Sequence, residues 1–172
     1  MILLDYSQIA LSNIIVQKLN DEDMIRHMIL NSIRMYNKKY RHEYGQMVIC
    51  ADGANTWRRD YFPQYKGMRK KNRKESDQDW TEIFRILNLV REEIRENLPY
   101  KVLHLEGCEA DDIIGSLVMK TQEFGQHEPV MIVSSDKDFV QLQKYTNIYQ
   151  YSPMKKRFIV EETPRRQLME LI

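Results

Sequence analysis

The sequence predicts an α/β fold in which a twisted, mainly parallel sheet is covered by helices on both faces. Two observations support this prediction: short apolar runs alternate with segments of helical periodicity, and most of these runs end in turn-forming or acidic residues. We find no internal repeat and no linker. The 172 residues are therefore expected to form a single domain, since domains have about 100–200 residues.

Six apolar runs have the length and composition of buried strands. They span residues 1–4, 46–51, 102–105, 130–133, 148–151 and 158–160. Apolar side chains three and four residues apart predict helices between them, at residues 21–39, 76–98, 109–124 and, for a short one, 139–142. Ser76 is the expected N-cap of the second helix, with Asp79 three residues on. Thr163-Pro164 predicts the start of a last helix.

The composition is typical of a soluble globular protein, with 30% charged and 42% hydrophobic residues. The longest stretch without Asp, Glu, Lys or Arg covers residues 6–17 and is too short to cross a bilayer. No basic segment precedes the first apolar run, so we expect no secretory signal and a cytoplasmic location. Cys50 and Cys108 form no zinc pattern and are expected to be thiols.

The net charge of +1 hides a strong segregation of charge. Residues 57–74 contain eight Lys or Arg and one acid, so this segment carries +7 and the remaining residues carry −6. Its cations alternate with aromatic residues, a combination that suits a phosphate backbone with stacked bases. We therefore predict a protruding basic arm at about residues 55–75 that contacts nucleic acid. A solvated loop whose aromatic side chains pack on the body is the alternative.

The arm residues expected to contact nucleic acid are one tyrosine and eight cations: Tyr65, Arg58, Arg59, Lys66, Arg69, Lys70, Lys71, Arg73 and Lys74. A second basic group at residues 155–157 is smaller, and we interpret it as a solvent-facing turn.

Acidic residues follow four of the predicted strands: Asp5, Asp52, Glu109, Asp111, Asp112, Asp136 and Asp138. In open α/β sheets the carboxyl ends of the strands form the edge where ligands bind. Carboxylates gathered there repel one another unless cations are present, and Mg²⁺ and Mn²⁺ prefer oxygen ligands. The pattern predicts a divalent metal site. A single acid in such a position can instead be a helix N-cap, which is the alternative for Asp112 and Asp138.

The acidic edge and the basic arm together indicate a metal-dependent nuclease. Two ions about 3.5–4 Å apart can bind a phosphodiester, activate water and stabilise the leaving oxygen. The arm supplies the attraction that an acidic pocket alone would deny a polyanion. The sequence contains no GxxxxGK[ST], GxSxG or HExxH motif, and its four histidines are scattered.

Several stretches of the chain resemble a known family: LLDYSQIALS at 3–12, WRRDYFPQYKGMRKKNRKES at 57–76, CEADDIIGSLV at 108–118, SSDKDFVQL at 134–142 and SPMKKRF at 152–158. They are similar to the metal-dependent 5′-nucleases, which include flap endonucleases, the exonuclease domains of bacterial polymerases and the ribonuclease H of T-even bacteriophages. The pair EADD and SSDxDF carries most of the likeness.

The resemblance implies a PIN-like core with an arch above the active site. It also implies a set of metal ligands: Asp5, Asp52, Glu109 and Asp111 for a first Mg²⁺ or Mn²⁺, and Asp136 and Asp138 with Asp111 for a second, while Asp112 supports the cluster through water. Lys66 and Arg69 would engage the scissile phosphate, and Tyr65 would stack or gate.

The implied reaction is hydrolysis of DNA or RNA–DNA hybrids at 5′ ends or flaps, as in RNA primer removal during replication. Single-stranded-DNA-binding or clamp proteins would be partners.

In the family a GDxxDN-like motif and a helix-hairpin-type DNA-binding part follow, and we expect both to be absent from this chain, which ends at Ile172. A module that binds branched nucleic acid without cutting it is therefore an alternative. Phosphotransfer with Asp5 as nucleophile is less favoured, because Asp5-Tyr6-Ser7 lacks a second carboxylate two residues on.

Overall fold

The computed structural model describes residues 1–17, 21–54, 57–58, 79–123 and 127–160. The first half of the described chain contains β1 (Ile2–Asp5), α1 (Tyr6–Gln17), α2 (Glu22–Tyr44), β2 (Met47–Ala51) and α5 (Trp80–Asn97). The second half contains β3 (Lys101–His104), α6 (Ala110–Thr121), β4 (Val130–Val133), the 3₁₀ helix η2 (Lys137–Lys144), β5 (Ile148–Ser152) and β6 (Arg157–Ile159). Most of the basic arm and the helix predicted from Thr163 lie outside the described residues.

The described strands form one six-stranded sheet in the order β3-β2-β1-β4-β5-β6. All neighbours are parallel except β5 and β6, which are antiparallel. The prediction of a mainly parallel α/β sheet is confirmed. Strand β1 lies between β2 and β4 and is covered on both faces, which explains why its residues before Asp5 are all apolar.

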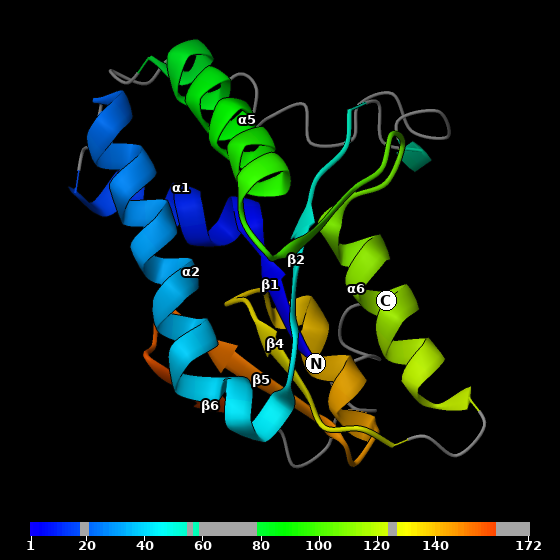
Figure 1. Ribbon diagram of the computed structural model, residues 1–172. Helices are drawn as coiled ribbons and strands as arrows, with labels where there is room; N and C mark the ends of the chain where they lie inside the picture. Colours follow the sequence, from blue (N-terminus) through cyan, green and yellow to red (C-terminus); the bar gives the residue numbers. More distant parts are fainter. Residues whose placement is uncertain (18–20, 55–56, 59–78, 124–126, 161–172) are drawn as a thin grey trace.

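Helices cover both faces of the sheet. Helices α1, α2 and α5 lie on one side, and α6 with η2 lies on the other (Figure 1). Alternate side chains of β1 point to opposite faces. Ile2 and Leu4 therefore belong to the core under α1, α2 and α5, whereas Leu3 belongs to the core under α6.

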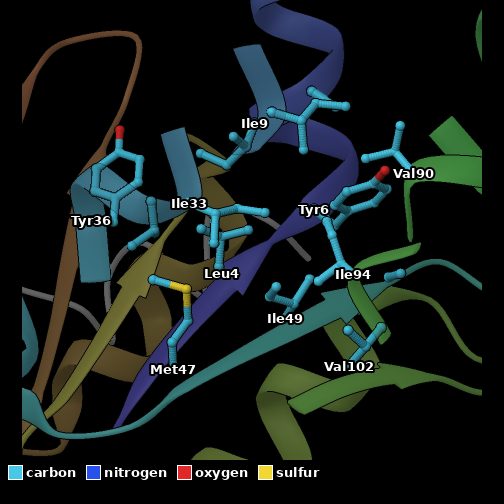
Figure 2. Close-up of a cluster of buried hydrophobic side chains, with 14 of the residues drawn as sticks. Leu4, Tyr6, Ile9, Ile33, Tyr36, Met47, Ile49, Val90, Ile94 and Val102 are labelled. Carbon is cyan, nitrogen blue, oxygen red and sulfur yellow. The ribbon is translucent and has the colours of Figure 1, made fainter. Parts of the chain in front are cut away.

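The first core fixes the start of α1, immediately after Asp5. Figure 2 shows Tyr6 and Ile9 of α1 beside Leu4, with Val90 and Ile94 of α5 on the far side of Tyr6. The Tyr6 hydroxyl donates a hydrogen bond of 2.6 Å to the carbonyl oxygen of Leu87. Asp5 thus sits at a rigid junction between strand and helix.

Three helices differ from the sequence prediction. Helix α1 was not expected, although its buried residues 6, 9, 10 and 14 have helical spacing. Helix α2 continues beyond residue 39 because Tyr40 and Tyr44 extend its buried stripe, and it ends at Gly45, whose φ is 89°. The N-cap of α5 is Asp79 rather than Ser76, since the Asp79 carboxylate accepts a hydrogen bond from the Glu82 amide.

Within the described residues, we find no helix with the length and apolar character needed to span a membrane.

Candidate metal centre

The predicted acids lie along the carboxyl edge of the sheet. Asp5 is the last residue of β1, and Asp52 follows β2, the strand paired with β1 on one side. Asp136 follows β4, the strand paired with β1 on the other side. Glu109 and Asp111 lie at the start of α6, whose N-terminus faces the same edge. Neighbouring parallel strands therefore bring together residues that are more than 100 positions apart.

Three carboxylates form a compact group at this edge. Each of Asp111, Asp136 and Asp138 offers a carboxylate oxygen, and these oxygens all lie within 4.8 Å of one another. Asp136 is the N-cap of η2, and its carboxylate accepts a hydrogen bond of 3.0 Å from the amide of Asp138. Asp111 and Asp136 are half-buried and Asp138 is exposed, so the group is open to solvent on one side.

Asp5 is a buried member of the site, with 7% of its surface exposed. Burial, and then the negative charges of Asp52 and Asp111, raise the pKa of Asp5 to about 7. The hydroxyl of Ser134 donates a hydrogen bond of 3.1 Å to its carboxylate, which opposes that rise only in part. Asp111 therefore belongs to two acidic groups, one with Asp5 and Asp52 and one with Asp136 and Asp138.

Asp52 is held by the start of α6. Its carboxylate accepts a hydrogen bond of 2.7 Å from the amide of Ala110. The next residue, Gly53, donates through its amide to the carbonyl oxygen of Cys108 at 2.8 Å. A Cβ on Gly53 would lie 1.9 Å from the carbonyl oxygen of Leu105, so only glycine fits between the two segments. This close approach holds Asp52 next to the N-terminus of α6.

Glu109 and Asp112 are paired with a cation from the arm. The Arg58 guanidinium donates to Glu109 at 3.0 Å and to both carboxylate oxygens of Asp112 at 2.9 and 3.0 Å. Trp57 donates its ring N–H to Asp112, and the Arg58 guanidinium lies 4.6 Å from the centre of that ring. Partial burial by itself would raise the pKa of Asp112, but the hydrogen bonds from Arg58 and the Glu109 amide lower it below its usual value.

Neither Asp112 nor Asp138 is itself an N-cap, but Asp112 does help to cap α6, because its carboxylate accepts a hydrogen bond of 2.9 Å from the Glu109 amide. Glu109 is the N-cap of α6 and Asp136 is the N-cap of η2, while Asp112 and Asp138 follow inside the first turns. Of the arm residues expected to contact nucleic acid, Arg58 is described, and its guanidinium contacts two carboxylates and the ring of Trp57. The others lie outside the described residues: Arg59, Tyr65, Lys66, Arg69, Lys70, Lys71, Arg73 and Lys74.

Sequence reasoning missed three polar residues that support the site. Ser134 contacts Asp5, and the side-chain oxygen of Gln8 accepts a hydrogen bond of 2.9 Å from the amide of Ser135. Gln150 donates to the carbonyl oxygens of Ser134 and Asp136. The signal for Gln150 was a polar residue at an inward position of a strand, between Ile148 and Ser152.

The donor set fits a hard divalent cation. All the ligand atoms are carboxylate oxygens, which Mg²⁺ and Mn²⁺ prefer. Burial, and then the charges of Asp52 and Asp111, raise the pKa of Asp5, so its ionised form is unfavourable without a counter-charge. A bound cation would favour the ionised form of Asp5.

The fold and the site define an α/β protein with a carboxylate cluster suited to divalent ions at the carboxyl edge of its sheet. Residues 5–168 match the model of the family described as 5′-3′ exonuclease, N-terminal resolvase-like domain, and the chain belongs to that family. The family expected from the sequence is therefore confirmed.

Named relatives agree with this assignment. The chain is 42% identical to the ribonuclease H of Enterobacteria phage T4 over 164 residues, which cover 91% of this chain and 53% of the phage protein. It is 33% identical to a 5′-3′ exonuclease of Buchnera aphidicola over 124 residues, covering 72% of this chain and 39% of that protein. The chain thus spans about half the length, or less, of these relatives.

Solved structures show the same fold. The T5 5′-exonuclease, in a structure with divalent zinc ions bound, matches with a TM-score of 0.75 at 17% identity, covering 96% of this chain and 59% of that one. The bacteriophage T5 flap endonuclease, in a complex with DNA and metal ions, matches with a TM-score of 0.71 at 18% identity, covering 91% of this chain and 56% of that one.

Proposed function

We propose that this chain is the catalytic core of a divalent-metal-dependent 5′-nuclease, which hydrolyses phosphodiester bonds. The observation that carries the proposal is the acidic cluster, in which Asp111, Asp136 and Asp138 lie within 4.8 Å of one another beside the buried Asp5. Membership of the 5′-3′ exonuclease family supports it.

We propose two positions for Mg²⁺, or Mn²⁺ in its place. Asp5, Asp52 and Asp111, with Glu109 beside them, would hold the first ion, and Asp111, Asp136 and Asp138 would hold the second. When bound, such a pair of ions activates water and stabilises the leaving oxygen of a phosphodiester.

The chain's own residues orient these ligands and the substrate. Ser134 fixes the carboxylate of Asp5, and the Ala110 amide fixes that of Asp52. Arg58 balances the charge of Glu109 and Asp112 at the N-terminus of α6. In the arm we propose that Lys66 and Arg69 bind the scissile phosphate, as cations at that place do in the family.

The proposed substrates are DNA and RNA–DNA hybrids with 5′ ends or flaps, including RNA primers. The names of two relatives, ribonuclease H and 5′-3′ exonuclease, support this choice, as does the T5 flap endonuclease complex with DNA. We further propose a cytoplasmic site of action, in the host cell if the chain is phage-encoded. Single-stranded-DNA-binding and clamp proteins are the proposed partners.

The test is Asp111→Asn, which removes the carboxylate shared by both groups. Cleavage of a labelled 5′ flap and of an RNA–DNA hybrid in Mg²⁺ should fall by at least about 100-fold, because metal ions contribute several kcal/mol to such reactions. Asp23→Asn is the matched control, since this exposed aspartate lies on α2 and pairs with Arg26. Unchanged cleavage by Asp111→Asn would overturn the proposal. Wild-type protein that shifts the substrate without cutting it in Mg²⁺ or Mn²⁺ would identify a binding module instead.

A further inference from the structure

Gln150 is a buried amide in the middle of β5, with 0% of its surface exposed. It is paired in register with Ile132 of β4, and its side chain reaches toward the end of that strand. Its Nε2 donates hydrogen bonds to two main-chain carbonyl oxygens, that of Ser134 at 2.9 Å and that of Asp136 at 2.8 Å. One side chain thus spans both ends of the turn that leads from β4 to the carboxylates.

The orientation of this amide follows from its partners. Both neighbours are carbonyl oxygens, so only the NH₂ group can face them. Its Oε1 is buried without a hydrogen-bond partner among the residues that the structure describes. An unpaired buried acceptor is unfavourable, whereas the two hydrogen bonds that Nε2 donates satisfy main-chain oxygens of the turn.

The two carbonyl groups lie in the turn that carries part of the acidic cluster. The Ser134 hydroxyl, in the same turn, donates to Asp5 and accepts a hydrogen bond of 3.2 Å from the amide of Asp136. Asp136 in turn accepts from the amide of Asp138. A change in the position of residues 134–136 would move Asp136 and Asp138 relative to Asp111 and would weaken the hydrogen bond to Asp5.

We infer that Gln150 is a positioning residue, whose amide holds residues 134–136 so that Asp136 and Asp138 face Asp111 across the second metal position. This inference rests on the proposed function. Groups that orient metal ligands without touching the ion typically change metal affinity by about 10–100-fold when they are removed. Gln150 should act in the same way.

The experiment compares Mn²⁺ binding, by calorimetry and by electron paramagnetic resonance, in the wild-type chain and in Gln150→Leu. We expect the affinity for one Mn²⁺ to fall by about 10–100-fold while the circular dichroism spectrum is unchanged. Gln150→Glu should lose more affinity for Mn²⁺ than Gln150→Leu does, since its carboxylate would face two carbonyl oxygens. Cleavage by Gln150→Leu should recover in excess Mn²⁺, which a general loss of structure would not allow.

Asn147→Leu is the matched control. Asn147 is also a buried amide, and it donates to the main-chain carbonyl of Glu128 at 2.8 Å, next to the start of β4 rather than its end. Its replacement should lower the melting temperature without changing the affinity for Mn²⁺. The comparison separates the loss of a buried hydrogen bond from the loss of ligand geometry.

The possible failures are distinguishable. A wild-type chain that binds no Mn²⁺ would overturn the proposed function itself. Wild-type binding that is lost in Asp111→Asn but is equal in Gln150→Leu would overturn only the role of Gln150. If Gln150→Leu does not fold, the unbranched Gln150→Met takes its place in the same measurement, and equal affinity there would have the same meaning.

Discussion

At the scale of single residues, Asp5 shows how the site lowers the stability of the fold when no cation is present. Its pKa lies at about 7 rather than the usual 3.8, mainly because the carboxylate is buried and then because Asp52 and Asp111 are close. The folded state therefore binds this proton more tightly than the unfolded state does. Ionised Asp5 destabilises the metal-free fold, and the same carboxylate becomes favourable when a divalent ion is bound.

The pH dependence of stability should reveal this effect. In chelator, the free energy of unfolding of the wild type should contain a component that falls as the pH rises from about 4 to about 7. The rise of about three units in the pKa of Asp5 corresponds to a loss of up to about 4 kcal/mol in the free energy of unfolding. Asp5→Asn should lack that component, so it should be the more stable protein at pH 8 and no more stable at pH 4. Urea unfolding at the two pH values measures the difference, and parallel stability curves would contradict the shift.

At the scale of elements, the site depends on how closely β2 and the segment before α6 approach each other. Two amide-to-carbonyl hydrogen bonds of 2.8 Å join them, from Gly53 to Cys108 and from Gly107 to Ala54. Gly107 has a φ of 80°, which glycine adopts without strain. The register of these two segments determines where Asp52 meets the N-terminus of α6.

Gly53→Ala should break this junction. The new methyl group would overlap the carbonyl of Leu105, and main chain cannot move aside as a flexible side chain can. We expect a loss of about 2–4 kcal/mol in the free energy of unfolding, together with weaker Mn²⁺ binding. Gly115→Ala in α6 is the control: among the described residues, no atom outside its own helix turn lies within 4 Å of the new methyl group, so helix propensity should make it neutral or slightly stabilising. Equal stability of the two variants in chemical denaturation would refute the steric argument.

At the scale of the whole molecule, opposite charges are separated along the chain. Residues 57–74 carry +7, and the acidic cluster lies on the body of the fold. A polyanion would be attracted by the first and, in the absence of cations, repelled by the second. Binding of nucleic acid should therefore depend on both salt and divalent metal.

Salt titration tests the contribution of the arm. The affinity for a flap substrate, measured in Ca²⁺ to prevent turnover, should fall steeply with added NaCl. Lys66→Ala combined with Arg69→Ala should reduce the slope of log K against log salt by roughly 1.4–1.8, at about 0.7–0.9 per phosphate contact. The rate of flap cleavage should fall, while the melting temperature should change little. Lys38→Ala with Arg41→Ala on α2 is the control. An equal slope of log K against log salt in the two double variants would contradict a contact between the arm and the nucleic acid.

Much of the fold and of the site could be predicted from the sequence, because both depend on local patterns. The central strands β1, β2 and β4 were short apolar runs with acids at or shortly after their ends, so parallel pairing was enough to bring Asp5, Asp52 and Asp136 to one edge. Helix α1 was missed because it follows β1 without a break and has no acid in its first turn or base in its last. Gln150 and Arg58 could not be predicted in their roles, since each acts through partners that only the tertiary structure brings near.

The order of the strands has a consequence for the timing of activity during synthesis. The carboxylates come from positions 5, 52, 111, 136 and 138, and β1 is complete only when β4, made much later, pairs beside it. A nascent chain that has emerged only as far as α5 holds two of these five acids and lacks the strand that places the last two. Such a chain cannot form the proposed centre. A ribosome translating this message therefore does not carry the proposed nuclease centre near its own RNA until β4 and the turn after it have emerged and docked.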